Sequence, residues 1–436
     1  MIVISIFSLF KIDEFFSALV LNFLFSIFFV FYLIPKEQRL IVSIGLIFTP
    51  YILSALLGFS TFAFAVSYCL CLHQLNKKHT HFYLTILLLC LIRPDGVIWG
   101  FGLVITRLIE KFQSHELHVE IKAGVCCLIL PGITYFILRA WYFAELLPLP
   151  FLVKASGDRD AGLFWQDSLQ SLKHACLPIL LVGLISTNKR YFYKKVVLFF
   201  LVPFVFYASM RLEQNIGNRF LAPFFFSACY LIARNENKKV LAIFVIASIW
   251  IAANVTEDTF RKLALSKNES VYYISNDMAQ LKGSLLTTEA GRLTYYSDWD
   301  AQDAWGLNTP AFAKKLISRN DIKSDKFNLI VAHCDLTLLK QDNIPKYNPN
   351  RSWENLCVEM VSGIKNQDYT VYYVPFLQPT SSSLLITKDC YRHDIYAISN
   401  KYTDQKKLAN ILEKYGAMKF SEFDGKIIDK WWICKE

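Results

Sequence analysis

The chain has 436 residues, of which 54% are hydrophobic, and its mean hydropathy is +0.32. This composition argues against a wholly soluble protein of such length. The formal net charge of +10 does not indicate a nucleic-acid partner, because the basic residues gather in short loops between apolar segments, as they do in membrane proteins.

The apolar segments divide the chain near residue 254. Residues 1–254 hold almost all of the long apolar runs, whereas residues 255–436 alternate charged, polar and apolar positions. We therefore predict a polytopic α-helical membrane domain over residues 1–254 and a soluble α/β domain over residues 255–436. Ten segments are predicted spans, and they must be helices because polar backbone cannot face lipid: 15–34, 40–57, 60–75, 82–92, 97–108, 123–142, 174–186, 196–210, 220–233 and 240–253.

Basic residues predict the orientation of these segments. Lys and Arg cluster in alternate loops, within residues 36–39, 77–78, 107–122, 189–195 and 234–239. The positive-inside rule places those loops in the cytoplasm. The remaining loops, the N-terminus and the C-terminal domain then lie outside. An external N-terminus requires an export signal, and residues 1–14 do not resemble one. We therefore expect that a leading span and its following loop are missing, and the alternative is that residues 1–10 insert as an interfacial segment.

The C-terminal domain contains alternating strand and helix patterns. Strands are predicted at 284–288, 293–297, 328–333, 369–374, 383–387 and 394–398, and helices at 310–318 and 403–415. Four cysteines lie in this domain, namely Cys334, Cys357, Cys390 and Cys434. An oxidising compartment would permit two disulfides in any of three pairings, and four free thiols are the alternative.

The most informative residues are the Arg93-Pro94-Asp95-Gly96 turn, which separates two apolar runs. Pro94 and Gly96 break the helix, and charges at a membrane edge usually face a polar site. Asp95 is a candidate general base, although it is equally suited to pairing with Arg93 or to capping the next helix.

Other charged residues fall on the same predicted external edge. Lys154, Arg211 and Arg219 join Arg93 as candidate ligands of a phosphate, and the alternative for each is an interaction with lipid headgroups. Glu145 is a second candidate catalytic carboxylate, or else an exposed loop charge. We find no phosphate-binding, nucleophile-elbow, zinc-protease or dinucleotide motif. No ligand cluster indicates a metal site, although a divalent metal remains possible.

Several stretches resemble the GT-C superfamily of membrane glycosyltransferases, and most of all its bacterial arabinofuranosyltransferase/mannosyltransferase-like members. Residues 91–96 (LIRPDG) resemble a TRP[ED]G turn, and residues 142–154 (YFAELLPLPFLVK) resemble a YFGDLLPNTFYAK loop. In the C-terminal half, residues 289–297 (EAGRLTYYS), 303–310 (DAWGLNTP) and 328–333 (NLIVAH) resemble an external-domain pattern, and residues 218–223 (NRFLAP) resemble the start of a span. The resemblance covers about residues 15–335 and depends on the order and spacing of these motifs.

The resemblance implies transfer of a sugar from a polyprenyl-phosphate carrier to a cell-envelope glycan or lipid, at the external face of the bacterial inner membrane. Arg93 and Arg219 would hold the donor phosphate, whereas Glu145 and Lys154 would line the acceptor side. Two expected acids are missing. The aspartate of a first external loop would precede Met1, and Ser60 occupies the position of an acid in the next external turn (GFST, residues 58–61). The present chain is therefore either a shortened transferase, with or without activity, or a degenerate membrane scaffold. A transporter is less consistent with polar groups gathered at one face.

Overall fold

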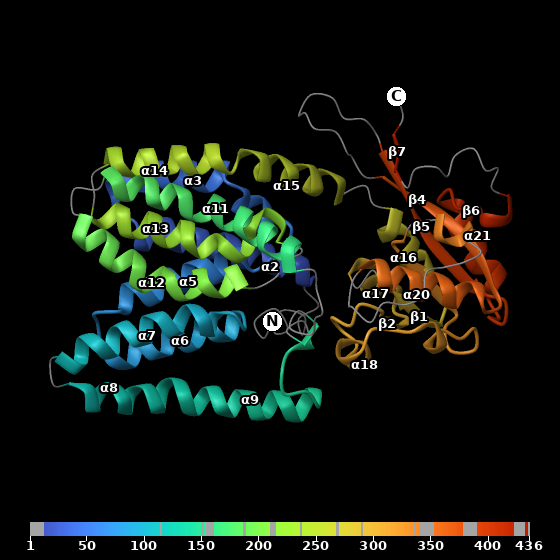
Figure 1. The fold of residues 1–436 in the computed structure, drawn as a ribbon, viewed down its shortest axis with the longest axis horizontal. Coiled ribbons are helices and arrows are strands. Elements are labelled where there is room, and N and C mark those ends of the chain that lie inside the picture. The colour runs from blue at the N-terminus through green and yellow to red at the C-terminus, as the bar shows by residue number, and fades with distance from the viewer. Residues whose placement is uncertain are drawn as a thin grey trace. The chain divides into compact units, whose positions relative to one another are not determined.

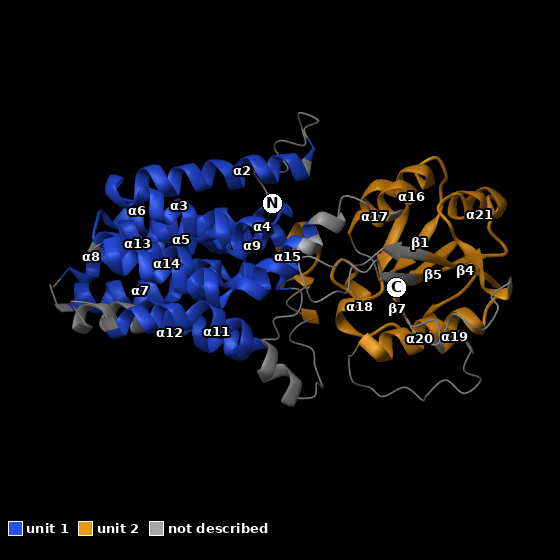
Figure 2. Cartoon of the chain, turned by 90° about the horizontal axis from the view of Figure 1, so that it is seen from above, with its two compact units in different colours: residues 1–139, 161–263 blue, residues 140–160, 264–436 orange. Residues whose placement is uncertain are grey.

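The computed structural model describes residues 13–113, 116–149, 152–153, 161–185, 189–209, 215–235, 238–266, 270–288, 291–334, 337–340, 353–377, 390–422 and 432–434. The chain forms two compact units, Met1–Arg139 with Ala161–Leu263 and Ala140–Asp160 with Ala264–Glu436 (Figure 2). Residues 140–160, which belong to the membrane domain in the sequence-based division, thus join the second unit.

The first unit is helical (Figure 1). Its elements are α2 (Glu14–Phe28), η1 (Phe29–Leu33), η2 (Lys36–Gln38), α3 (Arg39–Phe48), α4 (Pro50–Leu56), α5 (Thr61–Gln74), α6 (His79–Ile92), α7 (Gly96–Gln113), α8 (Leu117–Gly124), η3 (Val125–Ile129), α9 (Leu130–Phe143), α11 (Ala161–Ile185), α12 (Lys189–Ser209), η4 (Ile216–Leu221), α13 (Ala222–Asn235), α14 (Lys238–Ile251) and the start of α15 (Ala253–Ser266).

Most described residues of the ten predicted apolar segments are helical, although segment 40–57 is broken at Thr49 and segment 240–253 at Ala252. Within the described residues, three helices are long and apolar enough to cross a membrane: Phe15–Leu33, Leu117–Phe143 and Ile216–Arg234. The count rises to five if two bent pairs, Lys36–Phe48 with Pro50–Leu56 and Lys238–Ile251 with Ala253–Phe260, are each one span. The first unit is therefore compatible with a helical membrane protein, and the count of ten spans stays a prediction.

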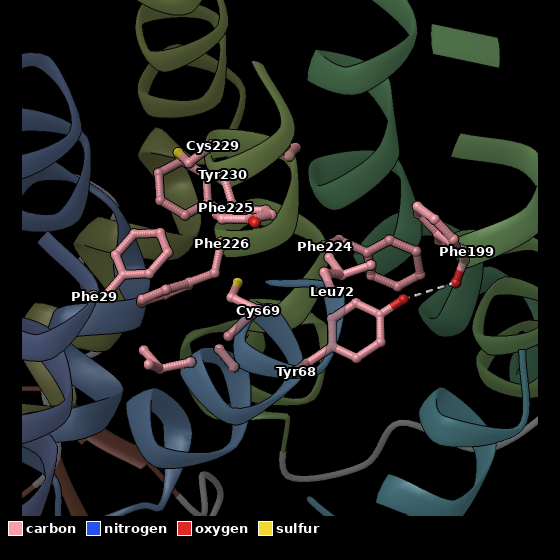
Figure 3. Packing of buried hydrophobic residues seen from close by; sticks show 14 of the residues in the cluster. Phe29, Tyr68, Cys69, Leu72, Phe199, Phe224, Phe225, Phe226, Cys229 and Tyr230 are labelled. Atoms are coloured by element: carbon pink, nitrogen blue, oxygen red, sulfur yellow. Dashed lines mark hydrogen bonds between the residues drawn. The ribbon is translucent and has the colours of Figure 1, made fainter. Parts of the chain in front are cut away.

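Aromatic side chains form the centre of the first unit. The ring of Phe226 lies 4.9 Å from that of Phe29 and 5.1 Å from that of Phe62. The Tyr68 hydroxyl donates to the Phe199 carbonyl at 3.1 Å (Figure 3), which satisfies a polar group that would be costly to bury alone. The seven free cysteines that the structure describes all lie in this unit, where a thiol packs as a small apolar group.

The second unit is built on a mixed sheet. Its strands are β1 (Ser284–Thr287), β2 (Asp300–Asp303), β3 (Leu329–Ala332), β4 (Tyr369–Leu377), β5 (Cys390–Ser399), β6 (Met418–Lys419) and β7 (Trp432–Cys434). The order is β2-β1-β3-β5-β4-β6, with β7 paired to β5. Strand β1 is parallel to β2 and β3, and the other pairs are antiparallel.

Helices cover both faces of this sheet (Figure 2). One face carries α16 (Ser270–Met278), α17 (Arg292–Ser297) and α21 (Gln405–Lys414), and the other carries α18 (Pro310–Lys314), α19 (Thr337–Lys340) and α20 (Trp353–Lys365), with η5 (Arg319–Asp321) and η6 (Phe420–Glu422) as short connections. Strand β3 shows why its sequence is a continuous apolar run: Leu329 and Val331 enter one core, whereas Ile330 and Ala332 enter the other.

The structure corrects one of the predicted strands of the second unit. Residues 293–297, predicted as a strand from their β-propensity, lie in helix α17. Leu293 and Ser297 are its buried residues, and a spacing of four puts them on one helical face. The predicted strand at 383–387 lies outside the described residues.

Of the four cysteines, Cys334 and Cys357 form a disulfide with a Cα–Cα distance of 5.4 Å, and the backbone register places Cys390 opposite Cys434.

Candidate functional site

The Arg93 turn connects α6 to α7. Arg93 has an extended backbone (φ −149°, ψ 141°), as expected for a residue before proline. A Cβ atom at Gly96 would lie 2.4 Å from the Leu89 carbonyl oxygen. Only glycine therefore lets α7 begin so close to the end of α6, and this close approach places Arg93 and Asp95 together.

Asp95 is held in a chain of hydrogen bonds. Arg93 donates from Nε to Oδ1 at 3.0 Å and from Nη2 to Oδ2 at 2.6 Å. The hydroxyl of Tyr207, on α12, donates to Oδ2 at 2.6 Å, and Nε1 of the fully buried Trp99 donates to the Tyr207 oxygen at 3.1 Å. Paired donors on a carboxylate fix a guanidinium in one orientation. This geometry suits a carboxylate that positions Arg93.

Arg219 comes from a second turn, η4, in which Gly217 and Asn218 have left-handed backbone angles. A Cβ at Gly217 would lie 2.9 Å from the Pro50 carbonyl oxygen, so glycine lets this turn pack tightly on α4. The Arg219 guanidinium then lies 3.6 Å above the centroid of the Phe59 ring, in the turn between α4 and α5.

One aromatic ring joins the two arginines. The Cζ atom of Arg93 lies 4.7 Å from the centroid of Phe220, and that of Arg219 lies 5.0 Å from it. Arg93 also lies 4.5 Å from the ring of Phe64 on α5. Cation–π contacts restrain both guanidiniums without neutralising them. Three turns far apart in sequence, at 58–60, 93–96 and 215–221, thus meet in one cluster.

The cluster has more positive charge than negative. Arg93 is paired with Asp95, with side chains 12% and 16% exposed, whereas Arg219 has no carboxylate partner among the described ion pairs. Nη1 of Arg219 and Nδ2 of Asn218 are both buried without a hydrogen-bond acceptor in the described part of the chain. Buried donors without acceptors are costly, so these two atoms indicate a place for an anionic or hydroxyl-bearing ligand.

A comparison with Arg107 shows that a buried guanidinium does not in general lack hydrogen-bond acceptors in this protein. Arg107, predicted from sequence only as a cytoplasmic loop charge, is 1% exposed. Its Nε donates to Glu120 at 2.9 Å, and its Nη atoms donate to the carbonyls of Leu75 at 2.6 Å and Lys77 at 3.0 Å. Arg107 is fully partnered and therefore structural, because it satisfies the C-terminal carbonyls of α5.

An apolar cavity of about 300 Å³ lies among α2, α4 and α5. It is lined by Leu19, Val20, Asn22, Phe23, Ser26, Ile52, Ala55, Leu56 and Phe62. Asn22 Nδ2 donates to the Phe59 carbonyl at 2.8 Å, and Asn22 Oδ1 accepts from the Phe62 N–H at 3.2 Å. Since the Phe59 ring also lies under Arg219, Asn22 and Phe59 together connect the cavity lining to the arginine cluster.

The remaining predicted site residues are not in this cluster. Glu145 lies in the second unit, is 16% exposed, and accepts from Lys314 Nζ at 2.6 Å. Lys154 and Arg211 lie outside the described residues. No group of three His, Cys, Asp or Glu side chains that could hold a metal occurs among the described residues.

Sequence reasoning missed the residues that shape the cluster, namely Phe59, Phe64, Trp99, Tyr207 and Phe220. Each lies within or beside an apolar run, where an aromatic side chain is expected for packing alone. Tyr207 carried a weak signal, because a hydroxyl in an apolar helix needs a partner.

No family model matches this chain, and no curated protein or solved structure matches it either. The functional interpretation therefore depends on the chain's own residues.

Proposed function

We propose that this chain is a membrane glycosyltransferase that moves a sugar from a polyprenyl-phosphate donor to a cell-envelope glycan or lipid acceptor. The observation that carries the proposal is the Arg93–Arg219 cluster, which Phe59 and Asn22 connect to an apolar cavity. Among the described residues the cluster has two guanidiniums and one carboxylate, which matches an anionic headgroup, and an apolar chain matches the cavity. A lipid-linked phosphate has both parts.

In this proposal Arg219 binds the donor phosphate through Nη1, which has no acceptor among the described residues. Arg93, which contacts the same Phe220 ring, provides a second positive charge for the phosphate. Asp95 positions Arg93, because accepting a proton would cost it the paired hydrogen bonds from the guanidinium. Displacement at the anomeric carbon also needs a base for the acceptor hydroxyl. From the resemblance alone we assign this role to Glu145, with Lys154 on the acceptor side, and we keep Arg211 as a candidate ligand of the donor phosphate.

The proposal includes ten spans with the second unit outside the cytoplasm of a bacterial inner membrane. The alternation of basic loops supports this orientation. The Cys334–Cys357 disulfide also supports it, because disulfides persist in oxidising compartments and are rare in the cytosol.

The alternative is a non-enzymatic membrane protein of the same architecture. Ser60 favours it, since this exposed residue stands in the turn beside Phe59 where the resemblance implies an acid. The unpartnered donors at Arg219 and Asn218 argue against it, because a scaffold has no reason to retain them.

A transfer assay in proteoliposomes separates the two. We expect Arg93→Ala and Arg219→Ala each to abolish sugar transfer from a lipid-linked donor, whereas Arg234→Ala should retain it. Arg234 is a suitable control because it lies at the other end of the same apolar helix and contacts the Tyr230 ring. Transfer that survives both cluster substitutions would refute the phosphate assignment. Absence of both transfer and polyprenyl-phosphate binding by the parent protein would favour the scaffold, because a transferase that lacks a catalytic acid would still bind the donor.

A further inference from the structure

Five tyrosines form a row on one face of the second unit, and we call this row the tyrosine patch. It runs from Tyr415 after α21 through Tyr273 and Tyr272 on α16 to Tyr296 and Tyr295 on α17. Successive ring centroids are 6.4, 5.4, 4.8 and 4.9 Å apart. The three helices lie on the same face of the sheet (Figure 2). Tyr295 and Tyr296 belong to the 289–297 motif, which the Arg93–Arg219 cluster does not use.

The patch concentrates the exposed apolar area of this part of the chain. Tyr272, Tyr273 and Tyr295 are 39%, 50% and 57% exposed. Among the residues from 270 onward whose side chains the structure describes, the only other exposed large hydrophobic side chain is that of Met418. Scattered exposed apolar residues need no explanation, but a contiguous group usually marks an interaction surface.

The chemistry of the patch favours a sugar. Tyrosine presents a flat ring and a hydroxyl on a side chain with little conformational freedom, and the electron-rich ring face attracts the C–H groups of a sugar ring. One end of the row also carries hydrogen-bonding groups. Asp277 Oδ2 accepts from the Tyr415 hydroxyl at 2.8 Å and from Lys414 Nζ at 2.7 Å.

Charge and composition argue against a membrane surface as the partner. The Lys414 cation is neutralised by Asp277, so this end of the row offers no excess of positive charge to anionic lipids. No Leu, Ile or Phe side chain is exposed on α16, α17 or α21, whereas membrane-inserting surfaces expose such residues together with Lys and Arg.

We propose that the tyrosine patch binds a neutral glycan, with sugar rings packed on Tyr273 and Tyr295 and hydroxyls bonded near Asp277. The choice of a glycan draws on the proposed transferase function, whose acceptor it would be. Binding itself does not require the Arg93–Arg219 cluster. If a glycan binds but no sugar is transferred, the proposal for the tyrosine patch holds and the transferase proposal fails. If sugar is transferred but no glycan binds, the transferase proposal holds and the proposal for the patch fails.

The test uses the intact protein in lipid nanodiscs. It is titrated with soluble mannan, arabinan, galactan and dextran fragments, and binding is measured by saturation-transfer NMR and calorimetry. We expect at least one fragment to bind the parent. The double substitution Tyr273→Ala with Tyr295→Ala should weaken binding by about tenfold or more, whereas the matched Tyr→Phe pair, which keeps both rings, should bind within about threefold of the parent.

A second measurement needs no substitution. Tetranitromethane nitrates exposed tyrosines, and a bound fragment should slow nitration of Tyr273 and Tyr295, which are 50% and 57% exposed. The proposal is overturned if the parent binds none of the fragments, or if the Ala pair binds as tightly as the parent. It is also overturned if the patch tyrosines are protected only by phosphatidylglycerol vesicles, which would make the patch a lipid-binding surface.

Discussion

Arg219→Met is the sharpest test of the arginine cluster. Methionine is long enough to remain between Phe59 and Phe220 and makes favourable contacts with aromatic rings, so the substitution removes the charge more than the packing. Hydrogen bonds to charged groups contribute about 1.5–3 kcal/mol. Since about 1.4 kcal/mol is a tenfold change in affinity, the variant should bind polyprenyl phosphate roughly 10- to 100-fold more weakly than the parent.

Thermal unfolding with and without added polyprenyl phosphate measures this loss. A ligand at 100 times its Kd stabilises the native state by about 2.7 kcal/mol. A variant whose Kd is about 100-fold higher would gain only about 0.4 kcal/mol at the same concentration. The matched control is Arg234→Met, at the opposite end of the helix Ile216–Arg234, and it should respond to the lipid like the parent.

The ligand-free stability of Arg219→Met separates function from structure. If Arg219 only supported the fold, its removal would lower the unfolding temperature without lipid. We expect little change or a small increase instead, because loss of a cation near Arg93 relieves repulsion while the methionine keeps the ring contacts. A marked loss of ligand-free stability, or an undiminished response to the lipid, would refute the reasoning.

Three further predictions concern other residues. Tyr207→Phe removes the hydroxyl that joins Trp99 to Asp95, and it should lower stability by about 1–3 kcal/mol and weaken lipid binding less than Arg219→Met in the same melting assay. Burial raises the pKa of Asp303 above 3.8, so its contribution is fully present below pH 3.8 and is lost as pH rises through the folded pKa. Asp303→Asn should remove that part of the pH dependence of amide exchange in residues 304–309, and an unchanged profile would contradict it. Cys357→Ser removes the disulfide between cysteines 23 positions apart and should lower the free energy of unfolding of the second unit by about 3 kcal/mol. Denaturant unfolding measures this loss, and the parent protein with its disulfide reduced should show the same free energy of unfolding as the variant.

Local sequence information was sufficient for most secondary structure. The apolar runs of residues 1–254 became helices because a hydrogen-bonded helix is the conformation that an apolar segment adopts in lipid. The Arg93 turn was visible because proline and glycine restrict the backbone directly. Residues 293–297 were misassigned because two adjacent tyrosines suggest a strand, whereas the burial of Leu293 and Ser297 against neighbouring helices decided for a helix.

The sequence by itself determined which charges stand at the ends of apolar segments, and hence that Arg93, Asp95 and Arg219 were candidates. It did not determine how they combine. Phe59, Phe64 and Phe220 converge on the two guanidiniums from turns far apart along the chain, and only helix packing brings such turns together. The same packing supplied Asp95 with partners and left Arg219 Nη1 without an acceptor among the described residues. Tertiary structure decided which of these charges is fully partnered among the described residues and which is not, because that depends on which acceptors the fold places within reach.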